Sequence, residues 1–306
     1  MNIVFMGTPD IAVPVLRELN KRYNVSLVVT QEDKKKGRGK KLLPPPVKVA
    51  AEELGIEVYQ PHNINDEVSI KKLEQIKADL FVVIAYGQIL KEDILNLPDL
   101  CINIHASLLP HLRGAAPINR AIIDGDIESG VTIMKMAKGL DTGDMSIVKK
   151  INIEGMNAEE LEDKMAELGS LAIVEFIENY KNNNIVFTPQ DNEKATYAEK
   201  IDKSTGFIDF EMMSTKQIIN LINGLYSSPG ASCMYRDVRF KILRAEEVDI
   251  ISEKKAGTII DSKKKLYIKT KDGVISVKSL QFPGKKAMDI KAFLAGNSFE
   301  EGSLLK

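Results

Sequence analysis

The chain has 306 residues, 44% of them hydrophobic and 28% charged, a composition typical of a water-soluble globular protein with two domains. No apolar stretch approaches the roughly 20 residues of a membrane-spanning helix, and the first residues lack the basic and apolar regions of a signal peptide. We therefore expect a cytoplasmic protein with no membrane partner.

The net charge is only −1, but the charges are unevenly distributed. Residues 1–202 carry 24 basic and 31 acidic side chains, whereas residues 203–306 carry 18 basic and 12 acidic ones. An acidic body with a basic appendage is compatible with an enzyme that carries a polyanion-binding module.

The first part of the chain alternates strand-like and helix-like segments. Continuous apolar runs rich in β-branched residues predict buried parallel strands, and the helical spacing between them predicts helices on both faces of the sheet. The predicted fold class is α/β, with a doubly wound, mostly parallel Rossmann-like sheet. The predicted strands cover residues 3–6, 25–30, 56–59, 80–85 and 101–105, and the predicted helices cover residues 11–19, 47–54 and 70–76.

A long helix is predicted to begin after Asn157, because Asn157 and Glu160 have the spacing of a capping box. The polar residues 182–184 end this helix, and the segment around Pro189 is polar and irregular. We therefore expect a catalytic domain over residues 1–188 and a linker over residues 189–204.

Residues 205–306 have a different pattern, with one predicted helix followed by short strands. This pattern predicts a small C-terminal β-barrel domain of the OB type, and such barrels often bind nucleic acids. The helix covers residues 215–223, and the strands cover residues 238–243, 256–260, 265–270 and 273–282.

The turn after the first predicted strand contains Gly7 and Asp10 but lacks the G-x-G-x-x-G pattern of dinucleotide-binding proteins. A dehydrogenase that uses a nicotinamide cofactor is therefore excluded at this position. A metal site is also not expected, because His62, His105 and His111 lack the spacing of zinc ligands.

Asn103 and His105 are two residues apart in a predicted strand, so their side chains project to the same face. They lie near the carboxyl end of the strand, where open α/β sheets bind their ligands. An amide next to an imidazole suits stabilisation of an oxyanion, although two structural polar residues would give the same pattern. Asp141 lies in a loop flanked by glycines, where an aspartate is either a turn former or a carboxylate brought to a site.

Several further motifs accompany these three residues. They are Ser107-Leu108-Leu109-Pro110, Arg113-Gly114-Ala115-Ala116-Pro117, Gly130-Val131-Thr132, Leu140-Asp141-Thr142-Gly143-Asp144, Gly37-Arg38-Gly39-Lys40-Lys41, Lys200-Ile201-Asp202 and Pro229-Gly230-Ala231. In this order they closely resemble the 10-formyltetrahydrofolate-dependent formyltransferases, and the resemblance covers nearly the whole chain. It implies an α/β N-terminal domain followed by a small β-barrel, in agreement with the predicted elements.

The resemblance also implies the site and the substrates. The implied catalytic residues are Asn103, His105 and Asp141, and the implied folate-binding residues are Ser107, Leu108, Leu109 and Pro110, with residues 88–90 as a wall of the pterin pocket. The implied formyl donor is 10-formyltetrahydrofolate. Within the family the match is closest to members that act on initiator methionyl-tRNA, which is the expected partner of a monomeric enzyme.

The expected chemistry is attack of the α-amino group on the formyl carbon. Asn103 and His105 would donate hydrogen bonds to the developing oxyanion, and Asp141 would orient His105 and relay the proton of the amine. Thiol acylation is not expected, since neither Cys101 nor Cys233 lies beside a base in the sequence.

Residues 31–48 form a basic segment with seven basic and two acidic side chains. Most such segments are solvated loops, but this one follows the second predicted strand, close to the edge where ligands bind. Neutralising a phosphate backbone releases counterions, and in the resembling family an insertion here reaches the tRNA acceptor end. The expected tRNA-binding residues are Arg38, Lys40 and Lys41, with Arg38 favoured by the geometry of its guanidinium group.

Two alternatives stay open from the residues alone. One is a formyltransferase for a small amine, such as a ribonucleotide or an amino sugar, although a small acceptor requires neither the basic segment nor the second domain. The other is a tRNA-binding protein that has lost catalysis, which an assay of formyl transfer would distinguish.

Overall fold

The computed structural model describes residues 1–36 and 41–306, and the chain divides into two compact units, each with its own hydrophobic core. The first unit comprises Met1–Gly114, Glu128–Asn152 and Glu162–Ala198, and the second comprises Ala115–Ile127, Ile153–Leu161 and Glu199–Lys306. No helix within the described ranges is both long and apolar enough to span a membrane.

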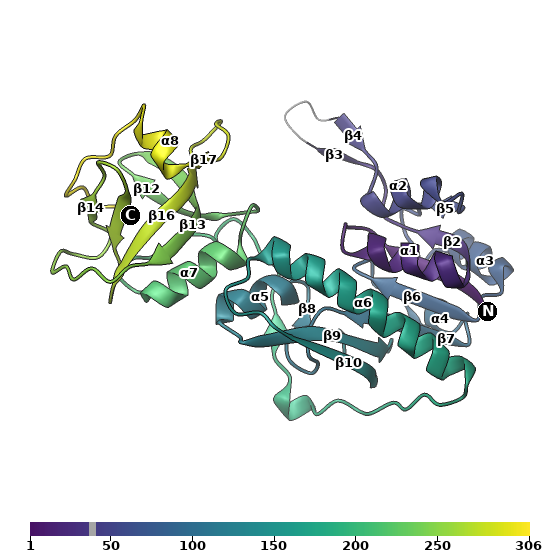
Figure 1. Ribbon diagram of the computed structural model, residues 1–306. Helices are drawn as coiled ribbons and strands as arrows, with labels where there is room; N and C mark the ends of the chain where they lie inside the picture. The colour runs from purple at the N-terminus through teal and green to yellow at the C-terminus, as the bar shows by residue number, and fades with distance from the viewer. Residues whose placement is uncertain (37–40) are drawn as a thin grey trace. The chain divides into compact units, whose positions relative to one another are not determined.

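A seven-stranded sheet forms the centre of the first unit, with the order β10-β9-β7-β6-β1-β2-β5 (Figure 1). The strands are β1 (Asn2–Gly7), β2 (Asn24–Val29), β5 (Val58–Tyr59), β6 (Leu80–Ile84), β7 (Leu100–His105), β9 (Glu128–Lys135) and β10 (Met145–Asn152). All pairings from β5 to β7 are parallel, whereas β9 and β10 are antiparallel additions. The predicted mostly parallel sheet is confirmed, and β9 and β10 are strands that the apolar pattern did not predict.

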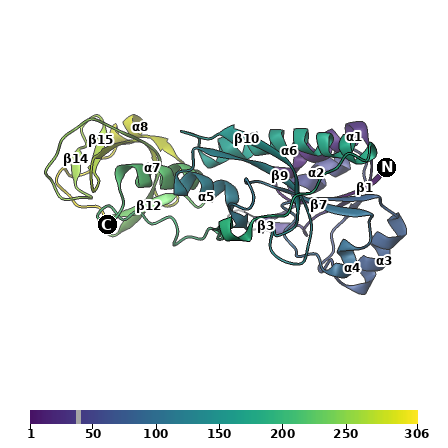
Figure 2. The same ribbon diagram turned by 90° about the horizontal axis from the view of Figure 1, so that it is seen from below.

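Helices cover both faces of this sheet. Figures 1 and 2 show α1 and α6 on one face and α3 and α4 on the other. The helices of the first unit are α1 (Ala12–Arg22), α2 (Pro46–Glu53), α3 (Glu67–Ile76), α4 (Glu92–Leu95) and most of α6 (Ala158–Lys181). A Cβ atom added to Gly169 of α6 would lie 3.3 Å from Ile104 and 3.5 Å from Val15, so α6 packs closely on β7 and α1.

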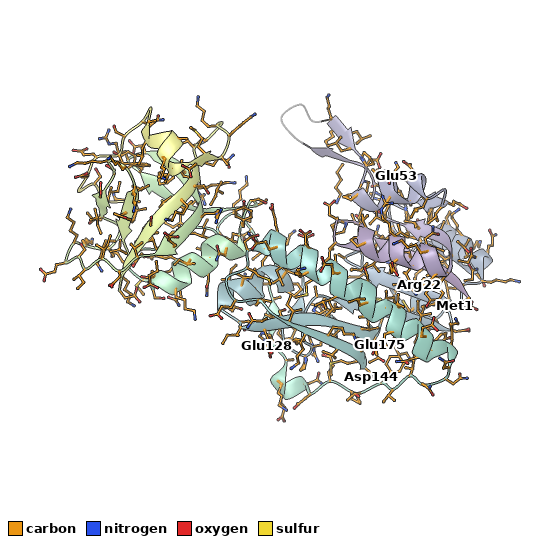
Figure 3. All side chains as sticks on the ribbon, in the orientation of Figure 1. Met1, Arg22, Glu53, Glu128, Asp144 and Glu175 are labelled. Carbon is orange, nitrogen blue, oxygen red and sulfur yellow. The ribbon has the colours of Figure 1, made fainter. Side chains whose placement is uncertain are left out.

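The predicted capping box at the start of α6 is confirmed. Asn157 Oδ1 accepts a hydrogen bond from the backbone N–H of Glu160 at 3.1 Å, and Glu160 Oε2 accepts one from the N–H of Asn157 at 2.9 Å. Figure 3 shows Glu175 further along the same helix, where its carboxylate pairs with Lys149 of β10. This contact joins α6 to the antiparallel edge of the sheet.

The side on which the chain adds new strands to the sheet changes at β1. The chain adds β2 on one side of β1 and later adds β6 and β7 on the other side. The carboxyl ends of β1, β6 and β7 therefore meet at one edge, at the switch point where doubly wound folds bind ligands. His105 is the last residue of β7, at this edge.

The second unit contains a curled, mainly antiparallel sheet with the order β12-β13-β16-β15-β14, and β17 pairs with β16. Its elements are α5 (Pro117–Asp124), α7 (Thr215–Gly224), β12 (Ala231–Tyr235), β13 (Val238–Glu247), β14 (Ile259–Asp261), β15 (Leu266–Lys269), β16 (Val274–Gln281), β17 (Met288–Asp289) and α8 (Ile290–Leu294). Phe282 stacks on Phe240 and Phe293, with ring centroids 5.0 and 5.2 Å apart. The predicted small β-barrel is confirmed as a curled half-barrel.

The basic segment contains two short strands, β3 (Lys34–Lys36) and β4 (Lys41–Leu43), which pair as an antiparallel hairpin. Lys48 Nζ contacts both carboxylate oxygens of Asp33 at 2.9 and 3.0 Å, and Gln60 donates to Asp33 Oδ1 at 2.8 Å. An ion pair therefore joins Asp33, the residue before β3, to α2, the helix that follows β4. We call β3 and β4 the basic hairpin.

Candidate active site

Asn103 and His105 lie on β7, and Asp141 lies in the loop between β9 and β10. The antiparallel pairing of β9 with β7 returns the chain to the same edge of the sheet, so this loop lies beside His105. Asp141 Oδ1 accepts a hydrogen bond from Asn103 Nδ2 at 3.5 Å, and Asp141 Oδ2 lies 3.6 Å from His105 Nδ1. The three side chains expected from the sequence therefore converge.

His105 is buried, with 5% of its surface exposed. Its Nε2 lies 2.9 Å from the backbone carbonyl of Leu112. Because a carbonyl oxygen can only accept a hydrogen bond, Nε2 carries the proton in this contact. Nδ1 is then the ring nitrogen that faces Asp141.

Asp141 is held in an unusual backbone conformation, with a φ of 51°. Aspartate tolerates this left-handed region better than most residues. The backbone N–H of Gly114 donates to Asp141 Oδ2 at 2.8 Å, which fixes the carboxylate. The chain also approaches closely at Gly143, where an added Cβ atom would lie 1.8 Å from the carbonyl oxygen of Lys135.

The segment expected to contact folate is firmly held. Thr132 Oγ1 donates to the carbonyl of Ser107 at 2.7 Å and accepts from the N–H of Leu109 at 3.2 Å. The hydroxyl of Ser107 donates to the carbonyl of His111 at 2.6 Å, so it is used within its own turn. The segment ends in a cis peptide bond between Leu109 and Pro110, while Leu108 lies only partly buried next to it.

The expected pterin wall follows β6. Gln88 accepts a hydrogen bond from the N–H of Ile64 at 2.9 Å through Oε1, and Leu90 belongs to the hydrophobic core. Ile89, in contrast, is 83% exposed. Of these three residues, Ile89 presents the apolar surface on which a flat ring could pack.

Both cysteines are buried and free. Burial raises the pKa of Cys101, two residues before Asn103, to about 12, and burial also raises the pKa of Cys233. Each sulfur is therefore a neutral thiol at pH 7, which does not suit a nucleophile. Within residues 1–36 and 41–306, no group of three or more His, Cys, Asp or Glu side chains could hold a metal ion.

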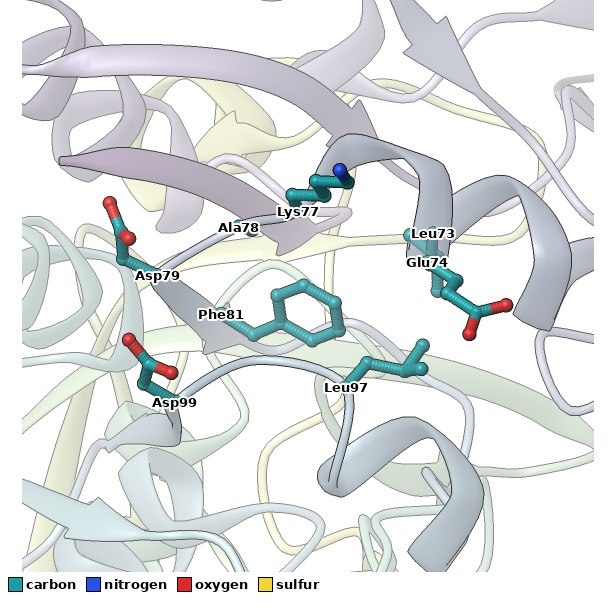
Figure 4. Close-up of a pocket in the computed structure, with 8 residues that line it drawn as sticks. All are labelled: Leu73, Glu74, Lys77, Ala78, Asp79, Phe81, Leu97 and Asp99. Carbon is teal, nitrogen blue, oxygen red and sulfur yellow. The ribbon is translucent and has the colours of Figure 1, made fainter.

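A hollow of about 260 Å³ lies at the opposite end of the sheet. Its lining includes Asp79 and Asp99, which directly precede β6 and β7, together with Lys77 and Phe81 (Figure 4). It is therefore at the amino ends of the strands, away from Asn103 and His105 at the carboxyl end of β7.

The expected tRNA-binding residues are only partly described. Lys41 is exposed on β4, and the backbone register places it opposite Lys36 on β3. Arg38 and Lys40 lie outside the described residues.

Three groups near Asp141 were not expected from the sequence: the N–H of Gly114 and the side chains of Arg113 and Gln190. Arg113 is 2% exposed and donates through Nε and Nη2 to Gln190 Oε1 at 2.9 and 2.7 Å. Because Arg113 is buried, its guanidinium group requires an acceptor. The sequence shows Arg113 and Gly114 only as part of a motif shared with the resembling family, which does not indicate that they lie beside Asp141.

Two family models match the chain over most of its length. Residues 1–177 match the formyl transferase domain, and residues 200–298 match the C-terminal domain of formyl transferases. The chain is 45% identical over 309 residues to a Methionyl-tRNA formyltransferase from Clostridioides difficile (strain 630), with all of both chains covered. The chain belongs to the methionyl-tRNA formyltransferase family. A second family member, from Kosmotoga olearia, is 41% identical and covers 99% of this chain and 98% of its own.

Several solved structures share the fold of this chain. The sugar 3N-formyl transferase WlaRD superposes with a TM-score of 0.70 at 21% identity, covering 94% of this chain and 99% of its own. Methionyl-tRNA formyltransferase from Clostridium thermocellum has a TM-score of 0.57 at 18% identity and covers 81% of this chain and 94% of its own. HypX from Aquifex aeolicus, in complex with tetrahydrofolic acid, has a TM-score of 0.65 at 16% identity. The match covers 96% of this chain but only 46% of HypX.

Proposed function

We propose that the chain transfers a formyl group from 10-formyltetrahydrofolate to the α-amino group of initiator methionyl-tRNA. The observation that carries the proposal is the convergence of Asn103, His105 and Asp141 in a chain that is 45% identical to a Methionyl-tRNA formyltransferase. In acyl transfer to an amine, an amide and an imidazole can stabilise the oxyanion, and a carboxylate can transfer the proton of the amine.

In the first step the neutral amine attacks the formyl carbon, and negative charge develops on the formyl oxygen. Asn103 Nδ2 donates a hydrogen bond to this oxygen. It is available to do so because, among the described residues, its side chain makes only one hydrogen bond, a long one of 3.5 Å to Asp141. Loss of one such donor typically costs about 2.7–4 kcal/mol of transition-state stabilisation.

His105, with both ring nitrogens protonated, is the second donor to the oxyanion through Nδ1, since Nε2 already donates to Leu112. Asp141 orients the ring from a distance of 3.6 Å and stabilises a positive charge on it. The amine loses one proton as the new C–N bond forms, and the folate nitrogen gains one as its bond to the formyl carbon breaks. Asp141 relays this proton through a water molecule.

The folate is proposed to bind along the segment from Ser107 to Pro110. The hydrogen bonds of Thr132 hold the backbone of this segment, so the ligand meets a preformed surface. The apolar side chain of Ile89 then packs against the pterin ring.

The basic hairpin is proposed to contact the phosphate backbone of the tRNA. Lys34, Lys35 and Lys41 are exposed, and they follow the strand next to β1 at the edge that carries the proposed site. A small acceptor has no extended polyanionic backbone that could contact all of these lysines. We extend the proposed binding to Arg38 and Lys40 of the same segment, and the proposal includes a monomeric enzyme acting in the cytoplasm.

The test is transfer of a labelled formyl group from 10-formyltetrahydrofolate. Methionyl-tRNA should become labelled, whereas uncharged tRNA and free methionine should not. Labelling of an amino sugar or ribonucleotide in preference to methionyl-tRNA would replace the proposed acceptor, and no labelling of any amine would refute the proposed activity.

A further inference from the structure

The segment that follows α6 is hydrogen-bonded at three places to the elements that carry the proposed site. We call residues 188–198 the active-site strap. At its start, Thr188 and Met145 exchange two backbone hydrogen bonds of 2.7 and 2.9 Å. At its end, β11 (Tyr197–Ala198) pairs in parallel with β8 (Arg113–Gly114). A polar segment with a proline is thus an ordered part of the first unit.

Gln190 belongs to the strap, and both the nitrogen and the oxygen of its side-chain amide are hydrogen-bonded to residues outside the strap. Only 9% of the residue is exposed. Its Nε2 donates to the backbone carbonyls of Asp141 at 2.8 Å and Gly143 at 2.7 Å. Its Oε1 accepts two of the three side-chain hydrogen bonds that Arg113 donates, and the third goes to Asn192 Oδ1 of the strap at 2.9 Å. An amide with donors on one side and an acceptor on the other fits these partners in one orientation only.

The partners of Gln190 belong to the two segments that hold Asp141, namely its own loop and the dipeptide Arg113-Gly114. Arg113 directly precedes Gly114, whose N–H holds Asp141 Oδ2. Gln190 therefore ties the backbone of the Asp141 loop to the same dipeptide that holds the Asp141 side chain. The side-chain amide of Gln190 is fully hydrogen-bonded in this buried network, and such a network is rigid, which suits a loop whose central residue has a positive φ.

Thr196 makes the equivalent connection to His105. Its hydroxyl accepts the N–H of Leu112 at 2.8 Å, and the carbonyl of Leu112 accepts the Nε2 proton of His105. The backbone of Thr196 also bonds the N–H of Arg113 at 2.9 Å and the carbonyl of Pro110 at 3.3 Å. The strap thus holds the peptide that orients the imidazole.

We infer that Gln190 and Thr196 are positioning residues of the formyl-transfer site: Gln190 acts through Asp141, and Thr196 acts through His105. This inference rests on the proposed function, because it requires Asp141 and His105 to act in the reaction. Neither Gln190 nor Thr196 is assigned a contact with the substrates.

Gln190→Glu is the sharpest variant, because it keeps the size of the side chain and the acceptor for Arg113. It replaces the amide nitrogen, which donates to the carbonyls of Asp141 and Gly143, with a carboxylate oxygen that cannot donate. We expect kcat to fall by about 10- to 100-fold, which corresponds to the loss of one to two hydrogen bonds. KM for both substrates should stay within about threefold of the wild-type values. Gln75→Glu, the same change on the exposed face of α3, is the control and should leave kcat unchanged.

A double-mutant cycle separates positioning from general structural damage. If Gln190 acts through Asp141, Gln190→Glu should cost less than threefold in kcat in an Asp141→Asn background. An equal loss in both backgrounds would overturn the inference while leaving the proposed function intact. Near-normal activity of Asp141→Asn alone would instead refute the proposed role of Asp141.

Thr196 provides an independent test that does not depend on Gln190. Thr196→Ser keeps the hydroxyl and should retain activity, whereas the nearly isosteric Thr196→Val removes the acceptor of the Leu112 N–H and should lower kcat about 10-fold. Circular dichroism and thermal midpoints of both variants check folding. Equal activity of the two variants would overturn the role assigned to Thr196.

Discussion

The Nε2 atom of His105 is bonded to the carbonyl of Leu112 at 2.9 Å, and this contact decides which ring nitrogen is available for chemistry. Nε2 is a donor to the protein, so Nδ1 is left facing Asp141. The contact also stabilises the fold, because it lies in a region where His105 is almost fully buried.

His105→Gln separates these two roles. The amide nitrogen of glutamine can replace Nε2 and keep the bond to Leu112, but nothing replaces Nδ1. We expect kcat to fall by about 100-fold or more, with a thermal midpoint close to that of the wild type. His105→Ala should lose as much activity and should also lower the free energy of unfolding by about 1–3 kcal/mol, because the Leu112 carbonyl loses its partner. Turnover of His105→Gln near the wild-type rate would rule out a role for Nδ1.

Asp141→Asn tests the carboxylate with little change in shape. Asparagine also tolerates a positive φ, and its Oδ1 atom can still accept the N–H of Gly114. We expect kcat/KM to fall about 100- to 10,000-fold, the usual contribution of a positioned acid–base group. A variant within threefold of the wild type, measured with saturating folate, would remove Asp141 from the proton relay.

Much of this site follows from short-range patterns. The spacing of Asn103 and His105 in an apolar run predicts that both side chains lie on one face at the end of a strand, and β7 shows this arrangement. The position of Asp141 depends on β9, whose pattern includes a glycine and two hydroxyl residues and does not stand out as a strand. The pairing of β9 with β7 brings the chain back to the site, and hydrophobic periodicity could not predict this pairing. The role of Asp141 is therefore predicted only through the resemblance to a family.

The strap could not be predicted for a related reason. Gln190 lies in a polar segment beside a proline, and such composition is shared by linkers and by ordered loops. The role inferred for Gln190 depends on four hydrogen bonds to three residues that are 47 to 77 positions distant in sequence. Contacts of this kind follow from tertiary structure alone.

Gly143→Ala tests the close approach that brings the Asp141 loop to β9. A Cβ atom at this position would lie 1.8 Å from the carbonyl oxygen of Lys135, so the loop must move. We expect a loss of about 1–3 kcal/mol in the free energy of unfolding, typical of overpacking, together with reduced kcat. Gly296→Ala is the control, since an added Cβ there meets no atom within 4 Å. Unaltered stability and activity of Gly143→Ala would show that the loop accommodates the methyl group.

Replacing Lys34, Lys35 and Lys41 by alanine tests the basic hairpin. We expect a higher KM for methionyl-tRNA, an unchanged KM for folate, and a salt dependence whose slope decreases by about 1 for each lost phosphate contact. Replacing Lys21, Lys71 and Lys164, three exposed lysines elsewhere in the first unit, removes the same charge and is the control. Equal effects of the two triple variants would indicate nonspecific attraction by net charge.

The ion pair at the base of the basic hairpin predicts a pH effect. A hydrogen bond from Gln60 and the contact with Lys48 lower the pKa of Asp33 below its ordinary value of 3.8. A carboxyl group whose pKa is lowered by folding stabilises the folded state above its ordinary pKa, and this contribution is lost as the pH falls through the lowered value. Asp33→Asn should therefore have a lower thermal midpoint than the wild type at pH 7, and the difference should shrink below pH 3.8. A difference that stays constant from pH 7 to pH 2.5 would show that the ion pair does not stabilise the hairpin.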